Sequence, residues 1–168
     1  LLINASAGSA RGHLTSLKAD NPMKPPMFCM LLRKYLTAAK LTGVRQQELD
    51  RLLFLDFDAT SEIGDPIRLT LCVEIMGTYS NLILLSQDGR IIDSAKRIDF
   101  AASEVRQILP GLPYVLPQPQ DKLNLETCAP EEILARLDRT PNKQLAPALL
   151  QAVQGISPLI SRELAFRT

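Results

Sequence analysis

The chain has 168 residues, of which 46% are hydrophobic and 22% charged, and its formal net charge is +1. This length is enough for one domain with its own core, or for one domain and part of a second. The small net charge gives little general attraction to nucleic-acid phosphates, because that attraction grows with the number of Lys and Arg residues brought to them. No apolar run approaches the ~18 residues of a membrane-spanning helix, so we expect a water-soluble protein.

The cysteines and the histidine give no sign of a metal, disulfide or triad site. Cys29, Cys72 and Cys128 are far apart, form no C-x-x-C pair and are odd in number. This pattern favours a reducing compartment, and we expect neither a disulfide framework nor a zinc site. His13 is the only histidine, and a lone one is usually structural or solvated. We therefore expect no catalytic residue, cofactor or metal.

The N-terminal residues predict a short hairpin followed by a helix. Strands are expected at residues 1–5 and 11–17, and the opening residue, which is not Met, suggests a cut through a strand of a longer protein. From Pro26 the apolar residues recur at helical spacing on one face. These are Phe28, Leu31, Leu32, Tyr35, Leu36 and Ala39, whereas Arg33, Lys34, Thr37 and Lys40 occupy the other face.

The middle of the chain predicts an antiparallel meander. Residues 53–58 and 67–76 alternate apolar and polar side chains with a period of two. Two further strands, at 82–85 and 90–93, flank Asp88-Gly89, a pair that favours a tight hairpin turn. Asp56 and Asp58 lie on one face of the first strand and could hold a divalent ion. No third ligand is identifiable, so a solvated strand edge is the favoured interpretation.

Residues 109–119 contain four prolines and a glycine, which predicts an extended connector and a domain boundary. Beyond it, a helix is expected from Pro130 and a second one, started or kinked by Pro147, as far as about Gly155. A last helix follows Ser157-Pro158. The predicted organisation is an α+β fold, with a β-rich domain at residues 1–124 and a helical extension at 125–168.

Several motifs occur in the order and at the spacing typical of one protein family. They are P-P-M-F-C-M-L-L-R-K at 25–34, Q-E-L-D-R at 47–51, E-I-G-D at 62–65, V-E-I-M-G at 73–77, S-N-L-I-L at 80–84, D-G at 88–89, I-I-D at 91–93, L-P-G at 109–111 with Tyr114, Pro117 and Lys122, and G-I-S-P at 155–158. Together they resemble the NFACT-N domain of the RqcH/NEMF/FbpA family over nearly the whole chain. The family's Arg-His after Gly77 is replaced here by Thr78-Tyr79.

The resemblance implies a fold similar to the N-terminal domain of formamidopyrimidine-DNA glycosylases, an antiparallel β-sandwich or barrel with a flanking helix, followed by short helices that lead toward a helix-hairpin-helix domain. It also implies a cytoplasmic ribosome quality-control factor and not a self-contained enzyme. Such a factor binds a stalled large ribosomal subunit with its nascent chain and recruits tRNA, alanyl in bacteria. The ribosome then adds a C-terminal alanine tail without a template.

The same resemblance assigns the tRNA-facing role to Asp50 and Arg51, together with an acidic residue in a segment that would precede this chain. Adjacent side chains on a strand leave opposite faces, so each residue needs its own partner. Arg51 would donate paired hydrogen bonds to a phosphate or base edge, and Asp50 would orient it or accept from a ribose or amine. A solvated surface pair is the alternative.

A basic strip is a second candidate RNA contact. Its four members are expected on or beside the first helix, where a solvated helix face is the competing interpretation. They are Arg33, Lys34, Lys40 and Arg45. Two other function classes remain open. One is a fibronectin-binding surface adhesin, after an older name in the family, and the other is a DNA-glycosylase-like enzyme suggested by the fold. The chain shows no signal peptide, repeats or N-terminal catalytic proline to favour either.

Overall fold

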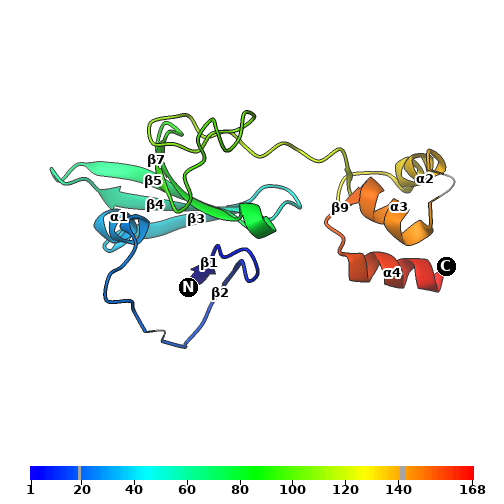
Figure 1. Ribbon diagram of the computed structural model, residues 1–168, viewed down its shortest axis with the longest axis horizontal. Coiled ribbons are helices and arrows are strands. Elements are labelled where there is room, and N and C mark those ends of the chain that lie inside the picture. Colours follow the sequence, from blue (N-terminus) through cyan, green and yellow to red (C-terminus); the bar gives the residue numbers. More distant parts are fainter. Residues whose placement is uncertain (19, 141–142) are drawn as a thin grey trace. The chain divides into compact units, whose positions relative to one another are not determined.

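The computed structural model describes residues 1–18, 20–140 and 143–168, which form two compact units. The first unit contains residues 1–47 and 51–117, and the second contains residues 48–50 and 118–168. In Figure 1 the first unit runs from blue to yellow-green, and residues 118–168 of the second unit run from yellow to red. None of the helices in the described ranges is long and apolar enough to cross a membrane.

The first unit is built on a five-stranded antiparallel sheet in the order β3-β4-β5-β6-β7 (Figure 1). These strands span Lys40–Gln46, Leu52–Thr60, Pro66–Glu74, Asn81–Ser86 and Ile91–Ser94. A separate hairpin, β1 (Leu2–Asn4) with β2 (Arg11–His13), precedes helix α1 (Met27–Leu36). The predicted α+β class and antiparallel meander are confirmed. Strand β3 was not predicted, and Lys40, which we expected on the helix, begins it.

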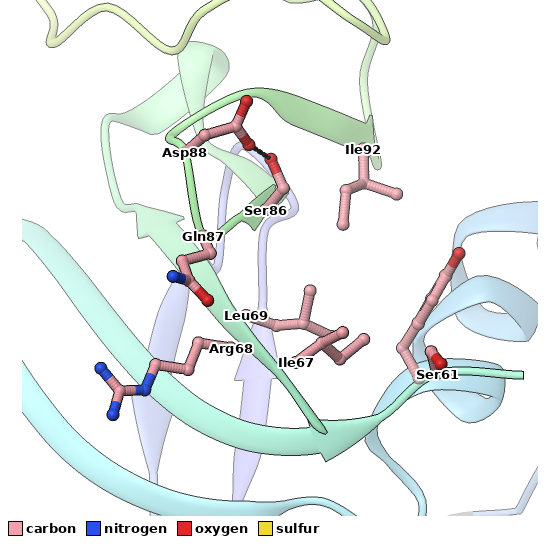
Figure 2. A pocket seen from close by; sticks show the side chains of 9 residues that line it. Ser61, Ile67, Arg68, Leu69, Ser86, Gln87, Asp88 and Ile92 are labelled. Carbon is pink, nitrogen blue, oxygen red and sulfur yellow. Dashed lines mark hydrogen bonds between the residues drawn. The ribbon is translucent and has the colours of Figure 1, made fainter. Parts of the chain in front are cut away.

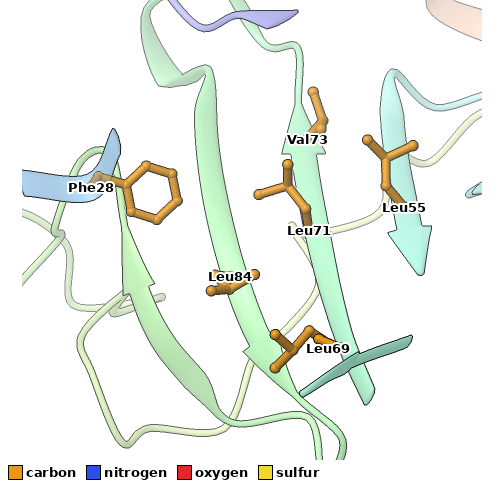
Figure 3. Packing of buried hydrophobic residues seen from close by; sticks show 7 residues of the cluster. Phe28, Leu55, Leu69, Leu71, Val73 and Leu84 are labelled. Atoms are coloured by element: carbon orange, nitrogen blue, oxygen red, sulfur yellow. The ribbon is translucent and has the colours of Figure 1, made fainter. Parts of the chain in front are cut away.

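Helix α1 covers one face of the sheet, and its apolar stripe is the predicted one. Phe28 is buried and points toward Leu71 and Leu84 of the sheet in Figure 3. The other five apolar positions of the stripe are partly buried against the same cluster. The odd-numbered residues of β5, from Ile67 to Val73, contribute to this face, as their alternation predicted. This helix-on-sheet layer is the larger part of the core.

The opposite face is covered by an irregular segment, residues 98–115. Ile108 lies in a second buried cluster with Cys72 and Ile83. The segment is bonded to itself and to the sheet, since Ile98 and Ile108 exchange backbone hydrogen bonds of 3.0 and 2.7 Å and the Ile91 amide donates to the Leu112 carbonyl at 2.8 Å. The prediction of an extended connector at 109–119 is therefore wrong for residues 109–115, which are bonded to or packed on the sheet unit. Its prolines prevent a regular strand because they lack an N–H group, yet the amides between them still bond.

The second unit consists of three helices and a short parallel pair of strands. Helices α2, α3 and α4 span Pro130–Asp138, Leu145–Ala152 and Pro158–Arg167, and β8 (Leu123–Asn124) pairs with β9 (Val153–Gln154). The starts of α2 and α4 are confirmed. Helix α3 ends three residues earlier than predicted, because Val153 and Gln154 pair with β8 as strand β9.

Ser157 caps helix α4, since its Oγ accepts the Ile160 amide hydrogen at 3.2 Å. We expect Ser157→Ala to lower the free energy of unfolding of the second unit by about 1 kcal/mol, because a helix N–H loses its acceptor. Ser157→Asp keeps an acceptor at the N-cap and should leave the stability near that of the wild type. Urea titration followed by far-UV circular dichroism measures both. Equal losses in the two variants would contradict the capping role.

Candidate functional site

Arg51 lies at the end of the sheet where β4 begins and β5 ends. Its side chain is exposed, and its carbonyl accepts the Ile75 amide hydrogen at 2.9 Å. The hydrogen bond from the Gln47 amide to the Leu52 carbonyl, 3.0 Å long, closes the connection from β3. No residue that the structure describes forms a hydrogen bond or ion pair with the Arg51 guanidinium. Arg51 thus combines a fixed backbone with an accessible charge.

Asp50 belongs to the second unit and is held there by a side chain from a distant part of the sequence. Its Oδ1 accepts a hydrogen bond of 2.7 Å from Gln154 Nε2. Next to it, Leu49 packs so closely on Gly155 that a Cβ added to the glycine would meet Leu49 Cδ1 at 3.0 Å, and Gly155 also has φ +84°. Glycine is therefore required in the G-I-S-P motif by both backbone conformation and space. The sequence offered no sign of the contact with Gln154.

A buried carboxylate lies in register with the residue that follows Arg51. Glu74, the last residue of β5, pairs with Leu52 on one side and Asn81 on the other, and its side chain is 1% exposed. Arg106 donates two hydrogen bonds to it, of 3.1 and 2.5 Å, and the Tyr114 hydroxyl donates a third of 2.9 Å. The Arg106 Nε–H also donates to the Val115 carbonyl at 2.6 Å. This network fastens segment 98–115 to the sheet beneath the Arg51 end.

The surroundings of this network suppress ionisation of its neighbours. Burial raises the pKa of the Cys72 thiol to about 12, so it stays protonated and is a poor nucleophile. Burial, together with the negative charge of Glu74, also raises the pKa of Tyr114 far above its usual value. The motif V-E-I-M-G contained Glu74 without indicating its role. One sign of a buried role was available in the sequence. Glu74 lies two residues after Cys72 on the same strand, so the two side chains share a face, and we expected Cys72 in the core.

The predicted basic strip is divided between the two faces of the sheet. Arg33 is exposed on α1, where Lys34 forms an exposed 2.6 Å ion pair with Glu62. Lys40 is in register with Asp58 and Arg45 with Phe54, and Phe54 belongs to the cluster on the face opposite α1. Cross-strand partners share a face. The structure therefore does not bring the four basic residues together.

Arg45 is already engaged. Its Nε and Nη2 donate to the two carboxylate oxygens of Asp56 at 2.8 and 3.0 Å, and Thr70 donates to the same carboxylate at 2.8 Å. The Arg45 hydrogen bonds, supported by Thr70, hold the pKa of Asp56 below its usual value. Within the part of the chain that the structure describes, no three His, Cys, Asp or Glu side chains gather closely enough to hold a metal ion. Asp56 is thus an ion-pair partner.

A cavity of about 540 Å³ opens on the α1 side of the sheet (Figure 2). Ile67, Leu69 and Ile92 form its apolar wall, and Tyr35 of α1 also lines it. Its polar lining includes Ser86, whose hydroxyl donates to Asp88 as the dashed line in Figure 2 shows. Among the described residues that line it, the charged side chains are Arg68 and Asp88.

Comparison with known proteins identifies the family. The model for NFACT N-terminal and middle domains matches residues 1–168. The chain is 36% identical over 168 residues to Rqc2 homolog RqcH of Bacillus subtilis, and 38% identical over 167 residues to the protein of that name from Streptococcus suis. These matches cover 99% and 98% of the chain but only 29% and 30% of the relatives, so the chain spans less than a third of their length.

A solved structure gives the same result. The N-terminal part of the fibronectin/fibrinogen-binding protein of Streptococcus suis superposes with a TM-score of 0.84 at 36% identity, covering 98% of this chain and 61% of that one. The likeness thus extends over both the sheet and the C-terminal helices. With the family motifs in their places on this fold, the chain belongs to the NFACT family, in which its relatives carry the name Rqc2 homolog RqcH.

Proposed function

We propose that this protein binds tRNA and a stalled large ribosomal subunit, and that it supports template-independent alanine tailing of the nascent chain. Membership of the family of RqcH proteins supports the proposal, and the single observation that carries it is Arg51, an exposed guanidinium on a fixed strand end. Peptide-bond formation would be carried out by the ribosome. This chain would contribute binding and orientation.

Arg51 suits RNA recognition for physical reasons. Its guanidinium is always charged and can donate two parallel hydrogen bonds to a phosphate or to a base edge. Its backbone is held by the Ile75 amide, so less conformational freedom is lost when RNA binds. In the same proposal Asp50, oriented by Gln154, accepts a hydrogen bond from a ribose hydroxyl or an exocyclic amine.

The four basic residues are proposed as RNA contacts in two separate groups. Arg33 and Lys34 would act from helix α1, and Lys40 and Arg45 from β3. Arg45 and Lys34 would have to share their charges with Asp56 and Glu62. Arg33 and Lys40 are therefore the stronger candidates of each group. We also propose a cytoplasmic location, which the three unpaired cysteines support.

Arg51→Ala in the intact protein is expected to weaken tRNA binding by about 1.5–3 kcal/mol, roughly 10- to 150-fold, because a charge-assisted contact is lost. At the concentrations in a cell this loss should abolish tRNA recruitment, and Asp50→Ala should do the same; both variants should remain folded. The measurement is affinity purification of each variant from cells, followed by sequencing of the bound RNA. Circular dichroism verifies that the variants are folded.

The matched control is Arg68→Ala, which removes an exposed arginine from the same sheet. It should retain the tRNA that co-purifies with the wild type. Unchanged tRNA recovery in both the Arg51 and the Asp50 variants would remove these residues from the site. Recovery of no ribosomal RNA or tRNA with the wild-type protein would reject the proposed function itself.

A fibronectin-binding adhesin is the second candidate, because the Streptococcus suis structural relative carries the name fibronectin/fibrinogen-binding protein. The two functions predict different locations for the native protein. Protease treatment of intact cells should spare a ribosome-associated factor together with cytosolic markers. Selective loss of the protein under these conditions would favour the adhesin.

A further inference from the structure

We propose that Tyr79 is a stacking platform for an unpaired RNA base next to Arg51, an inference that rests on the proposed function. Tyr79 lies in the turn between β5 and β6, in the 3₁₀ segment Gly77–Tyr79. Its side chain is 77% exposed. A single exposed aromatic residue is ordinary on a protein surface, so the inference depends on how this turn is built.

The turn is held in one conformation by hydrogen bonds from within. The Tyr79 and Ser80 amides donate to the carbonyls of Met76 and Gly77, each at 3.1 Å. The Ser80 hydroxyl accepts the Met76 amide hydrogen at 2.9 Å. Gly77 takes φ +59°, which L-residues with side chains rarely adopt. Hydrogen bonds within residues 76–80 therefore restrict the backbone on both sides of Tyr79.

Buried polar side chains then tie the turn to the sheet. The Asn81 amide group donates to the Lys96 carbonyl at 2.7 Å and accepts the Lys96 amide hydrogen at 2.9 Å. The Lys96 ammonium group lies 3.4 Å from the Thr78 carbonyl and 3.1 Å from the Ala5 carbonyl, and donates to both. Tyr79 is thus bracketed by two anchored residues, Thr78 and Ser80.

Four of the five buried polar residues found in the described part of the chain lie in or around this turn. They are Glu74, Ser80, Asn81 and Ser94, and the fifth is Ser161 of the second unit. Buried polar groups must be hydrogen-bonded, and a satisfied set restricts the backbone to one arrangement. A fixed surface turn with an exposed ring at its tip is a preorganised contact, because little entropy remains to be lost on binding.

Tyr79 and Arg51 lie at the same end of the sheet. Leu52, Glu74 and Asn81 are in register across β4, β5 and β6, so Arg51 and the turn both project beyond this row. The Ile75 amide, which starts the turn, donates to the Arg51 carbonyl. The same end of the sheet therefore carries both an exposed guanidinium and an exposed aromatic ring.

This pair of groups selects the kind of RNA that would bind. A guanidinium can bind a phosphate of any RNA, but an aromatic side chain can stack only on a base whose face is free. Bases in a duplex are already stacked on their neighbours. Tyr79 itself is uncharged, so its ring adds no general attraction to phosphates. The expected ligand is an unpaired segment, such as an RNA loop.

The test compares two probes on the intact protein by fluorescence anisotropy. One is an RNA stem-loop with unpaired loop bases, and the other is a fully paired RNA duplex of equal length. Tyr79→Ala should weaken stem-loop binding roughly 5- to 150-fold and leave duplex binding unchanged. Tyr79→Phe keeps the ring and should bind like the wild type. Phe100→Ala removes another exposed ring of the same unit, 67% exposed, and should have no effect.

The outcomes separate this inference from the proposed function. If Arg51→Ala weakens stem-loop binding and Tyr79→Ala does not, the platform is rejected while the proposed function stands. Equal loss on both probes in Tyr79→Ala would also reject stacking. If the wild-type protein binds neither probe, the proposed function and the platform fail together. Tyr79 makes no side-chain hydrogen bond within the described ranges, so its variants should fold.

Discussion

Glu74→Ala is expected to lower the free energy of unfolding of the sheet unit by about 3–5 kcal/mol. The substitution leaves the Arg106 guanidinium without its carboxylate, and this side chain is only 16% exposed. It also removes the acceptor of the Tyr114 hydroxyl. An uncompensated charge in a place that water reaches poorly is the physical reason for the size of the effect. Urea unfolding followed by circular dichroism measures it.

Glu62→Ala is the matched control, because Glu62 forms an ion pair with Lys34 in which both side chains are exposed, 73% and 47%. Glu62→Ala should lower the free energy of unfolding by less than about 1 kcal/mol, since water already screens this ion pair. Arg106→Ala combined with Glu74→Ala should cost less than the sum of the single changes, because they share one interaction. Similar losses in Glu74→Ala and Glu62→Ala would show that the buried network does not stabilise the fold.

Ile108→Ala is expected to destabilise the same unit by about 2–5 kcal/mol. Ile108 is 1% exposed in the cluster that covers the face of the sheet opposite α1. The change leaves a cavity between segment 98–115 and the strands, and a loosely attached connector would show no such loss. Near-UV circular dichroism during urea unfolding measures the change, because it reports on packing around Phe54 and Tyr114, whose rings lie edge to face.

Val105→Ala provides the comparison within the same segment, since Val105 is 69% exposed. We expect it to change the free energy of unfolding by less than about 0.5 kcal/mol. A small effect of Ile108→Ala, equal to that of Val105→Ala, would mean that the segment is not part of the core. Of the residues in these two predictions, Glu74 lies at the end of the sheet that carries Arg51 and Tyr79.

Elements with one buried face were predictable from the sequence. The apolar stripe of α1 and the alternation of β5 indicate which side chains face the core. This is possible because side chains repeat every 3.6 residues around a helix and every 2 residues along a strand. The sequence of strand β3 has no such pattern. It is an edge strand whose Val44 and Leu41 are 60% and 47% exposed, so no face of it is consistently apolar.

Long-range polar contacts were not predictable. Arg106 and Tyr114 reach Glu74 across 32 and 40 residues of sequence, and Gln154 reaches Asp50 across 104. No local pattern encodes such a pairing, since it depends on how loops and strands meet in space. The proline-rich stretch was misread for the same reason. Prolines exclude a regular strand, but the burial of Ile108 and the bonds to β7 are decided by the fold.

The sequence by itself determined the family, the α+β class, the apolar face of α1 and the identity of Asp50 and Arg51 as candidate residues, because motifs and local periodicity are properties of the chain. Only the tertiary structure decided that Arg51 is exposed at a fixed sheet end, that Asp50 is held by Gln154, and that the basic residues are divided between two faces. Exposure, pairing and grouping arise when distant segments pack together.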